Sequence, residues 1–205
     1  MTVLKTPAVW KPTAALSSTA TPFAIRAEQA SDVRAREALL DASFGKSRHA
    51  RTCQRLRDGR KPAEGLAFSA VRDGELVGTI RLWHVSAAGV PALVLGPLAV
   101  DASCRSLGIG AALMRHAIAA AKARGHAAVI LRGDPAYYAR FGFSADKTAC
   151  LDLPGPFERE RLLGVELRDG ALDGVTGMIV ATGVKAPEAR GHRRVKRQRP
   201  APRAA

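Results

Sequence analysis

The chain has 205 residues, of which 47% are hydrophobic, 24% charged and 5% aromatic, and its formal net charge is +14. This composition is typical of a globular domain and excludes a collagen-like chain, a wholly disordered chain and a small disulfide scaffold. The three cysteines lack C-x-x-C spacing, so we expect neither a disulfide framework nor a metal site. Because there is no apolar stretch of about 18 residues and no apolar signal core, we expect a cytoplasmic protein that does not enter the membrane.

The positive charge is concentrated near the C-terminal end. Residues 185–205 hold eight Lys or Arg and one acid, Glu188, so half of the net charge lies in a tenth of the chain. Such a segment, with three prolines and few large apolar residues, cannot bury enough surface to offset its ordering entropy. We predict a disordered basic tail over 185–205, a disordered segment rich in Pro, Thr, Ser and Ala over 1–22, and one folded unit over 23–184.

The folded unit is expected to begin with a short strand over 23–26 and a helix. Ser31 is a candidate N-cap for this helix. Seven basic residues follow within 46–61, in either a second helix or a loop. The helix is predicted because apolar residues recur at helical spacing at Val33, Leu39, Leu40 and Phe44.

A β-hairpin and a central strand are expected next. Two runs with strand character, 66–72 and 75–83, are separated by Asp73-Gly74, a strong hairpin signal. The run 92–100 is too apolar for an exposed strand. It contains Gly96-Pro97, and proline offers no amide hydrogen, so we expect a bulge or a place where two strands part.

The remaining elements give the fold class. A helix is predicted over 108–124, stopped by Gly125, and its inward face would carry Ile109, Leu113, Ala117, Ala120 and Ala121. The order of helix, hairpin and then strand-helix-strand indicates an α/β (α+β) fold, with a mixed, mostly antiparallel sheet flanked by helices. The other predicted elements are strands over 127–131, 162–167 and 178–181 and a short helix over 134–142.

The segment with the clearest chemistry runs from Cys104 to Ala112, where a buried strand leads through a loop into the long helix. The first amides of a helix have no internal partner, and the helix dipole makes this end attractive to anions. Gly108 and Gly110 let the backbone approach a ligand closely, and Arg105 adds a fixed charge. This combination suits a pyrophosphate.

Two other phosphate-binding motifs fail on the residues themselves. A Walker loop needs Gly-Lys-Ser/Thr, and neither Lys nor Ser/Thr follows Gly110. A dinucleotide fingerprint needs a third glycine near position 113, where this chain has Leu113. Simple close packing of the helix on a strand remains the alternative explanation of the two glycines.

The pattern Arg-x-x-Gly-x-Gly after a strand reading L-x-V-D resembles the acyl-CoA-binding motif of the GNAT superfamily of N-acetyltransferases. A second signature lies downstream, where residues 138–143 read Tyr-Ala-Arg-Phe-Gly-Phe and resemble the Tyr-x-x-x-Gly-Phe of that family. The longer run 133–143 is similar to one bacterial branch of predicted acetyltransferases. The resemblance covers about residues 23–184 and implies a GNAT-like fold.

The resemblance also implies a donor site for acetyl-CoA. The backbone of Leu98, Ala99 and Val100 would bind the pantetheine arm, and an amide near Leu98 or Val100 would polarise the thioester carbonyl. The residues expected to hold the pyrophosphate are Arg105, Ser106, Leu107, Gly108, Ile109, Gly110, Ala111 and Ala112.

Tyr138 lies where the family has its general acid, which protonates the departing CoA thiolate. A phenol is protonated at neutral pH, so it can supply that proton; the alternative is that Tyr137 and Tyr138 only pack in the short helix. For the general base the candidates are Glu75, His84 and Asp101, each of which is also explained as a solvated or turn residue. Since there is no nucleophile-elbow serine, direct attack by the amine is expected.

Two other functions remain open. The basic tail and the 46–61 cluster would give salt-sensitive, sequence-independent binding to nucleic acid. A non-catalytic GNAT-like protein that binds acyl-CoA is the second alternative. The resemblance implies that segments 31–61 and 150–184 select the acceptor amine. If the arginines of 46–61 line the acceptor side, they would disfavour polyamines and favour acceptors with a carboxylate or phosphate group. The resemblance also makes a homodimer an option.

Overall fold

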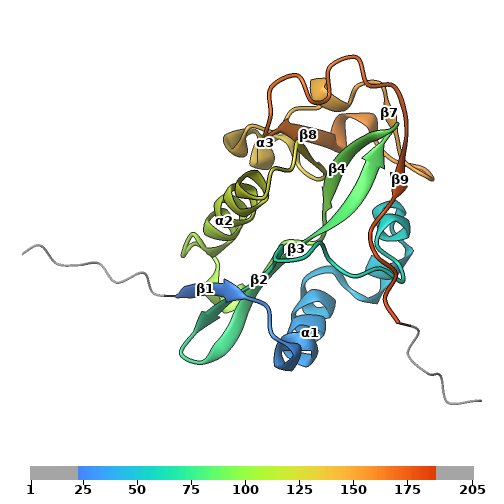
Figure 1. Ribbon diagram of the computed structural model, residues 1–205. Coiled ribbons are helices and arrows are strands. Elements are labelled where there is room, and N and C mark those ends of the chain that lie inside the picture. Colours follow the sequence, from blue (N-terminus) through green and yellow to red (C-terminus); the bar gives the residue numbers. More distant parts are fainter. Residues whose placement is uncertain (1–22, 188–205) are drawn as a thin grey trace, which may run out of the picture.

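In a computed structural model, residues 23–187 are described, and the predicted segment 1–22 and the chain from 188 onward lie outside them. Figure 1 shows the strands crossing the centre of the molecule with helices on both sides. The strands are β1 Ala24–Ala27, β2 Ala67–Arg72, β3 Glu75–Ala87, β4 Val90–Leu95, β5 Ala99–Val100, β6 Ala128–Arg132, β7 Leu151–Asp152, β8 Leu162–Glu166 and β9 Gly177–Ala181. The α-helices are α1 Val33–Phe44, α2 Ile109–Ala123 and α3 Pro135–Tyr138. The 3-10 helices are η1 Ala30–Asp32, η2 Lys46–Ala50, η3 Thr52–Leu56, η4 Ala102–Cys104, η5 Ala139–Phe141, η6 Asp146–Thr148 and η7 Arg159–Arg161.

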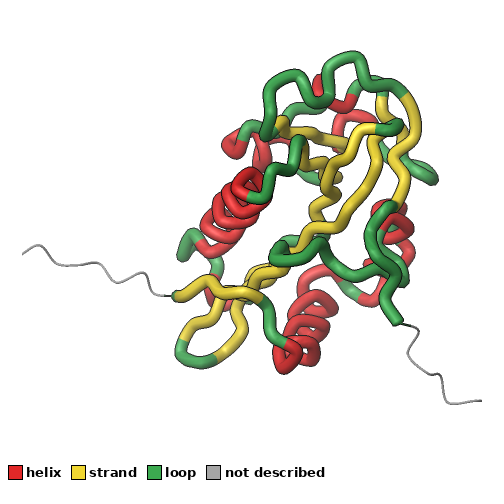
Figure 2. The backbone as a smooth tube through the Cα atoms, viewed as in Figure 1, coloured by secondary structure: helices red, strands yellow, loops and turns green. Residues whose placement is uncertain are grey.

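The sheet is mixed and mostly antiparallel, as predicted. Its main path runs β1-β2-β3-β4-β6-β8, and only the β4–β6 and β7–β9 pairs are parallel. The first part of β3 pairs with β2 and β5, whereas its last residues pair with β4 and β9. The strand path through the molecule is drawn in yellow in Figure 2. The long strand β3 therefore connects the two halves of the sheet.

The predicted hairpin is confirmed at its turn. Asp73 and Gly74 both have positive φ, 52° and 83°, as the tight two-residue turn between β2 and β3 requires. β3 runs four residues beyond the predicted end, to Ala87, because residues 84–87 pair with β4 and residues 85–87 also pair with β9. The pairing with β9, a strand far along the chain, could not be foreseen from the local pattern.

Helix α1 starts later than predicted and has a different cap. The expected N-cap Ser31 lies inside η1, and the carboxylate of Asp32 instead accepts from the Gln29 amide at 2.8 Å. Asp32 is buried, and its carboxylate also accepts hydrogen bonds from Arg26 and from the Ser69 hydroxyl, which offset the cost of burying the charge. Val33, predicted on the inner face, is 45% exposed. The buried side chain at the start of α1 is thus the carboxylate of Asp32, and a search for apolar residues at helical spacing cannot find it.

Helix α2 packs its predicted face against the sheet. Ile109, Leu113, Ala117 and Ala121 are buried, as is Met114, while Ala120 is partly buried. This face joins the largest apolar cluster, which includes Ile80 and Leu82 of β3.

Helix α1 lies on the other side of β2 and β3 (Figure 1). There Leu39 and Leu40 pack with Ala99 in a separate cluster.

The region 46–61 contains the two short helices η2 and η3, followed by a turn, rather than one helix or an open loop. Near the end of the described chain, Lys185 pairs with Arg60, and the Ala186 amide donates to the Gly59 carbonyl. No helix within residues 23–187 is long and apolar enough to cross a membrane.

Candidate active site

The central feature of the site is a bulge between β4 and β5. Both strands pair with β3, with Leu95 opposite Leu82 and Ala99 opposite Thr79. The chain advances four residues from Leu95 to Ala99, whereas the facing stretch of β3, from Leu82 to Thr79, spans only three. The β4–β5 segment therefore has one extra residue, which forms the bulge. β6 pairs with β4 only at Leu93 and Val94. The sequence prediction of a bulge at Gly96-Pro97, where neighbouring strands part, is confirmed.

The bulge leaves backbone groups free to bind a ligand. Among the described residues, the Leu98 amide has no backbone hydrogen-bond partner, and Pro97 has no amide hydrogen to give. Leu98 lines two adjoining cavities, of about 270 Å³ and about 400 Å³. Since the Leu98 N–H is unpaired and the residue lines both cavities, this amide is a candidate donor to a carbonyl oxygen of a ligand.

The smaller cavity lies between the bulge and the start of α2. It brings together five predicted donor-site residues with Ser43, Phe44, Tyr137 and Tyr138. Arg105, at its mouth, has no carboxylate within 4 Å in the described part of the chain. The five predicted residues are Leu98, Ala99, Val100, Arg105 and Gly110.

The turn into α2 has the backbone that an anion site needs. Ser106 and Gly108 have φ values of 70° and 75°, and Gly108 is the N-cap. A side chain at Gly110 would have its Cβ 3.1 Å from the Tyr137 hydroxyl and 3.6 Å from a Val100 methyl group. Six other predicted contributors do not line this cavity, and one of them, Ile109, is a core residue that is 1% exposed. The six are Ser106, Leu107, Gly108, Ile109, Ala111 and Ala112.

Tyr138 lines both cavities from α3. Asp134 caps this helix by accepting from the Ala136 amide at 2.9 Å, and the Tyr138 ring packs edge-on against Phe143 with centroids 5.9 Å apart. Burial raises the pKa of the Tyr138 phenol to about 12, with smaller effects from Tyr137 and Asp134. Tyr138 therefore keeps its proton throughout the physiological pH range.

Gly133 makes room for this tyrosine. A Cβ at Gly133 would lie 2.2 Å from a carbon of the Tyr138 ring, closer than any unbonded contact allows. The bare backbone at the end of β6 therefore sets how deeply the phenol enters the site.

The larger cavity is lined by arginines. Five of them contribute to its wall, and Asp134 is the only acidic residue there. Three come from the 46–61 cluster, but sequence reasoning missed Arg132 at the end of β6 and Arg161 before β8. Their strands pair antiparallel, Arg132 opposite Leu162, so only the sheet brings these two near the cluster. The five are Arg48, Arg51, Arg57, Arg132 and Arg161.

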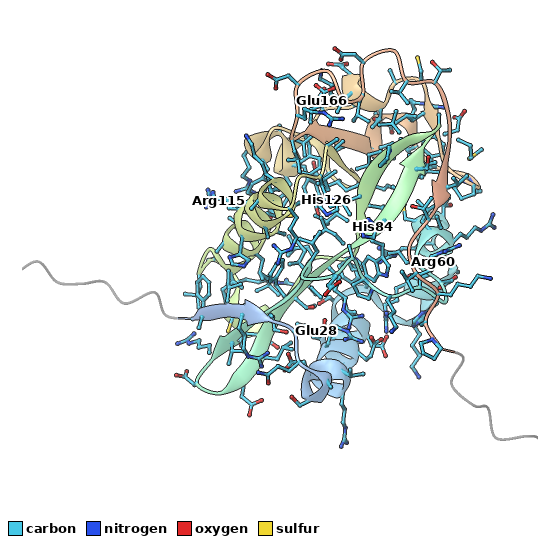
Figure 3. All side chains as sticks on the ribbon, viewed as in Figure 1. Glu28, Arg60, His84, Arg115, His126 and Glu166 are labelled. Carbon is cyan, nitrogen blue, oxygen red and sulfur yellow. The ribbon has the colours of Figure 1, made fainter. Side chains whose placement is uncertain are left out.

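None of the three candidate bases lines the two cavities. Asp101 accepts from the Ser103 amide and hydroxyl, which holds the pKa of its carboxyl below the usual value. His84 lies near His126, with the ring centroids 5.3 Å apart and the rings tilted by 51° (Figure 3). Glu75 is exposed at the hairpin. Within residues 23–187 no cluster of three or more His, Cys, Asp or Glu could hold a metal ion.

Comparison with known proteins now identifies the family. The model of the acetyltransferase (GNAT) family matches residues 32–143, which include the bulge, the α2 turn and Tyr138. The chain belongs to this family. Family membership makes it an acyltransferase, and the GNAT-like fold expected from the two motifs is confirmed.

Two relatives illustrate the relationship. The uncharacterized N-acetyltransferase YhbS of Escherichia coli K12 is 32% identical over 157 residues, which cover 76% of this chain and 93% of that protein. The crystal structure of E. coli YhbS in complex with CoA has a TM-score of 0.69 at 31% identity and covers 81% of this chain and 93% of its own. A Brucella melitensis GNAT acetyltransferase in complex with acetyl-CoA has a TM-score of 0.52 at 25% identity, with coverages of 74% and 98%.

Proposed function

We propose that this GNAT protein transfers an acetyl group from acetyl-CoA to a primary amine by direct attack. The observation that carries the proposal is the pair of adjoining cavities that share Leu98 and Tyr138 at the bulge. The smaller cavity would hold the donor and the larger one the acceptor. The CoA and acetyl-CoA named for the two solved relatives support this donor.

The residues of the smaller cavity fit such a donor. Arg105 and the first amides of α2 offer a cation and unpaired N–H groups to a pyrophosphate. The lack of side chains at Gly108 and Gly110 keeps this backbone accessible. The exposed strand edge at Leu98–Val100 offers main-chain groups to the two amides of a pantetheine arm. A thioester supplies the activated acyl group for the reaction.

The chemical roles follow from position. The Leu98 amide would donate to the carbonyl oxygen as negative charge develops there, in the manner of an oxyanion hole. Tyr138 would hold its hydroxyl proton ready for the departing sulfur. Cys53 also lines the larger cavity, but burial raises the pKa of its thiol, so it is not an activated nucleophile. This supports direct attack over an acyl-enzyme.

Calorimetric titration with acetyl-CoA tests the donor site. Arg105→Glu combined with Gly108→Val reverses the charge and places a β-branched residue at a φ of 75°. We expect the wild type to bind with micromolar affinity and the double variant to bind at least about 30-fold more weakly, given the loss of two anion-site features.

Lys122→Glu is the matched control, because it makes the same charge change in the last turn of the same helix, on an exposed residue. We expect it to keep wild-type affinity. If the wild type does not bind acetyl-CoA, the proposed function is wrong. If it binds acetyl-CoA, yet Tyr138→Phe leaves every measured property unchanged and no amine is acetylated, a non-catalytic acyl-CoA-binding role is the better description.

A further inference from the structure

The arginines of the larger cavity differ in whether their charge is already neutralised. Arg48 donates to Glu37 at 2.5 Å and to Asp41 at 2.8 Å, and Arg132 binds Glu158. The other three, Arg51, Arg57 and Arg161, have no carboxylate within 4 Å in the described part of the chain. The wall thus keeps a surplus of positive charge.

Of the three arginines without a carboxylate, Arg57 alone is buried, at 9% exposure, whereas Arg51 and Arg161 are exposed. Its Nε donates to the Cys53 carbonyl at 3.2 Å, and its guanidinium lies over the Trp83 ring, 5.3 Å from the centroid. Burial lowers the pKa of this guanidinium to about 10, so it is still charged at neutral pH. A buried cation without a counter-ion is costly.

The terminal nitrogens of Arg57 remain free to meet a ligand. No hydrogen bond from them is found among residues 23–187, although the Nε is paired. Nη1 lies 2.9 Å from the position that a Cβ of Gly96 would occupy, so the bare backbone at the bulge is what admits the guanidinium. The bulge therefore places a cation in the wall of the larger cavity, which Leu98 also lines.

Arg57 also lines a third cavity beyond Pro97, but that cavity contains Glu37 and Asp58 as well. Asp134 is the only acid of the larger cavity, and its carboxylate is engaged in capping α3. An anion in the larger cavity would therefore meet little repulsion, and it would lie in the space that Tyr138 also lines.

We propose that the acceptor is a small amine that also carries a carboxylate or phosphate group, and that Arg57, assisted by Arg51 and Arg161, binds this anion. The inference rests on the proposed function, because it names the substrate class of the same site. A planar guanidinium can bind either anion through two parallel hydrogen bonds. Polyamines would be disfavoured by the same charges.

The test uses pairs of amines that differ in the anionic group, namely O-phosphoethanolamine with ethanolamine and 4-aminobutyrate with butylamine, and spermidine as the cationic case. Acetyl transfer is followed by thiol release, and binding of each amine to the CoA-saturated full-length protein is followed by calorimetry. We expect the anionic member of at least one pair to bind at least 10-fold more tightly than its neutral partner.

Arg57→Gln should then raise KM for the anionic amine by 10- to 100-fold, while kcat for the neutral partner and the Kd of acetyl-CoA stay within about threefold. Arg55→Gln is the matched control, because Arg55 lies two residues before Arg57, in η3, is exposed, and donates to the Pro154 carbonyl away from the cavity. If Arg57→Gln does not fold, the Arg51→Gln/Arg161→Gln double variant, which changes only exposed residues, serves the same purpose.

Three results overturn the inference: equal binding of anionic and neutral amines, a preference for spermidine at low salt, or weakening of acetyl-CoA rather than of the amine by Arg57→Gln. The last would assign Arg57 to the donor. Acetylation of neutral amines alone refutes the inference but leaves the proposed function intact. Arg57-dependent binding of an anionic amine without any acetyl transfer supports the anion site and refutes the proposed function.

Discussion

At the scale of single residues, the position of Tyr138 is set by packing and not by a hydrogen bond. Tyr138 is held by packing against Phe143 and by the space at Gly133, and its hydroxyl has no hydrogen-bond partner within residues 23–187. The hydroxyl is therefore available to a ligand. Tyr137, next in the chain, is instead stacked under Arg140, whose guanidinium lies 4.2 Å from the ring centroid.

Removal of the Tyr138 hydroxyl should slow catalysis without weakening the donor complex. We expect Tyr138→Phe to reduce kcat by about 100-fold or more, as for loss of a general acid, with the Kd of acetyl-CoA within about twofold. Steady-state kinetics with a saturating amine and calorimetry measure the two quantities. A larger loss of kcat in Tyr137→Phe than in Tyr138→Phe would contradict this prediction and assign the acid role to Tyr137.

At the scale of elements, one buried carboxylate joins three segments. Asp32 accepts from Arg26 of β1, from the Ser69 hydroxyl of β2 and from the Gln29 amide before η1. The Arg26 guanidinium is the main cause that holds the pKa of Asp32 well below its usual range. The entry to α1 is thereby attached to the edge of the sheet, and α1 in turn carries Phe44 to the cavities.

Asp32→Asn should destabilise the fold. The loss of the ion pair and of one acceptor should lower the free energy of unfolding by about 2 kcal/mol, because Arg26 is itself partly exposed and screened. Urea denaturation at pH 7 measures this difference. A change below about 0.5 kcal/mol would show that the network is not an anchor.

The pH dependence has a definite sign. Because the pKa of Asp32 is lower in the folded protein, its contribution to stability is complete above about pH 5 and is lost as the pH falls through 4 toward the folded value. The difference in stability between wild type and Asp32→Asn should therefore shrink as the pH falls from 5 to 3. A constant difference over this range would contradict the assignment.

At the scale of the whole molecule, the proposed donor and acceptor sites depend on how the two halves of the sheet meet. β3 pairs with β5 along one part and with β4 along another, and the bulge between them opens both cavities. Arg132 and Arg161 reach the larger cavity from the β6–β8 part of the sheet, whereas Arg57 directly follows η3. Only the assembled sheet creates the arginine wall.

The basic C-terminal segment can be tested apart from this site. Residues 188–205 contain seven Lys or Arg and one acid. Deleting them should reduce affinity for duplex DNA at low salt by at least 10-fold and flatten its salt dependence, while acetyl-CoA affinity and acetyl transfer are unchanged. Filter binding at several salt concentrations measures the first effect. Equal DNA affinity with and without the segment would refute a nucleic-acid role for it.

Local sequence determined much of this protein. The Asp73-Gly74 turn, the α2 helix with its glycine boundaries and the break at Gly96-Pro97 follow from backbone preferences of a few adjacent residues, and two short motifs indicated the family. The tertiary structure decided the rest. The pairing of β3 with β9, the burial of Asp32 and the approach of Arg132 and Arg161 to Arg57 arise from contacts between residues distant in the chain. No local pattern records such contacts, because they exist only once the strands have paired.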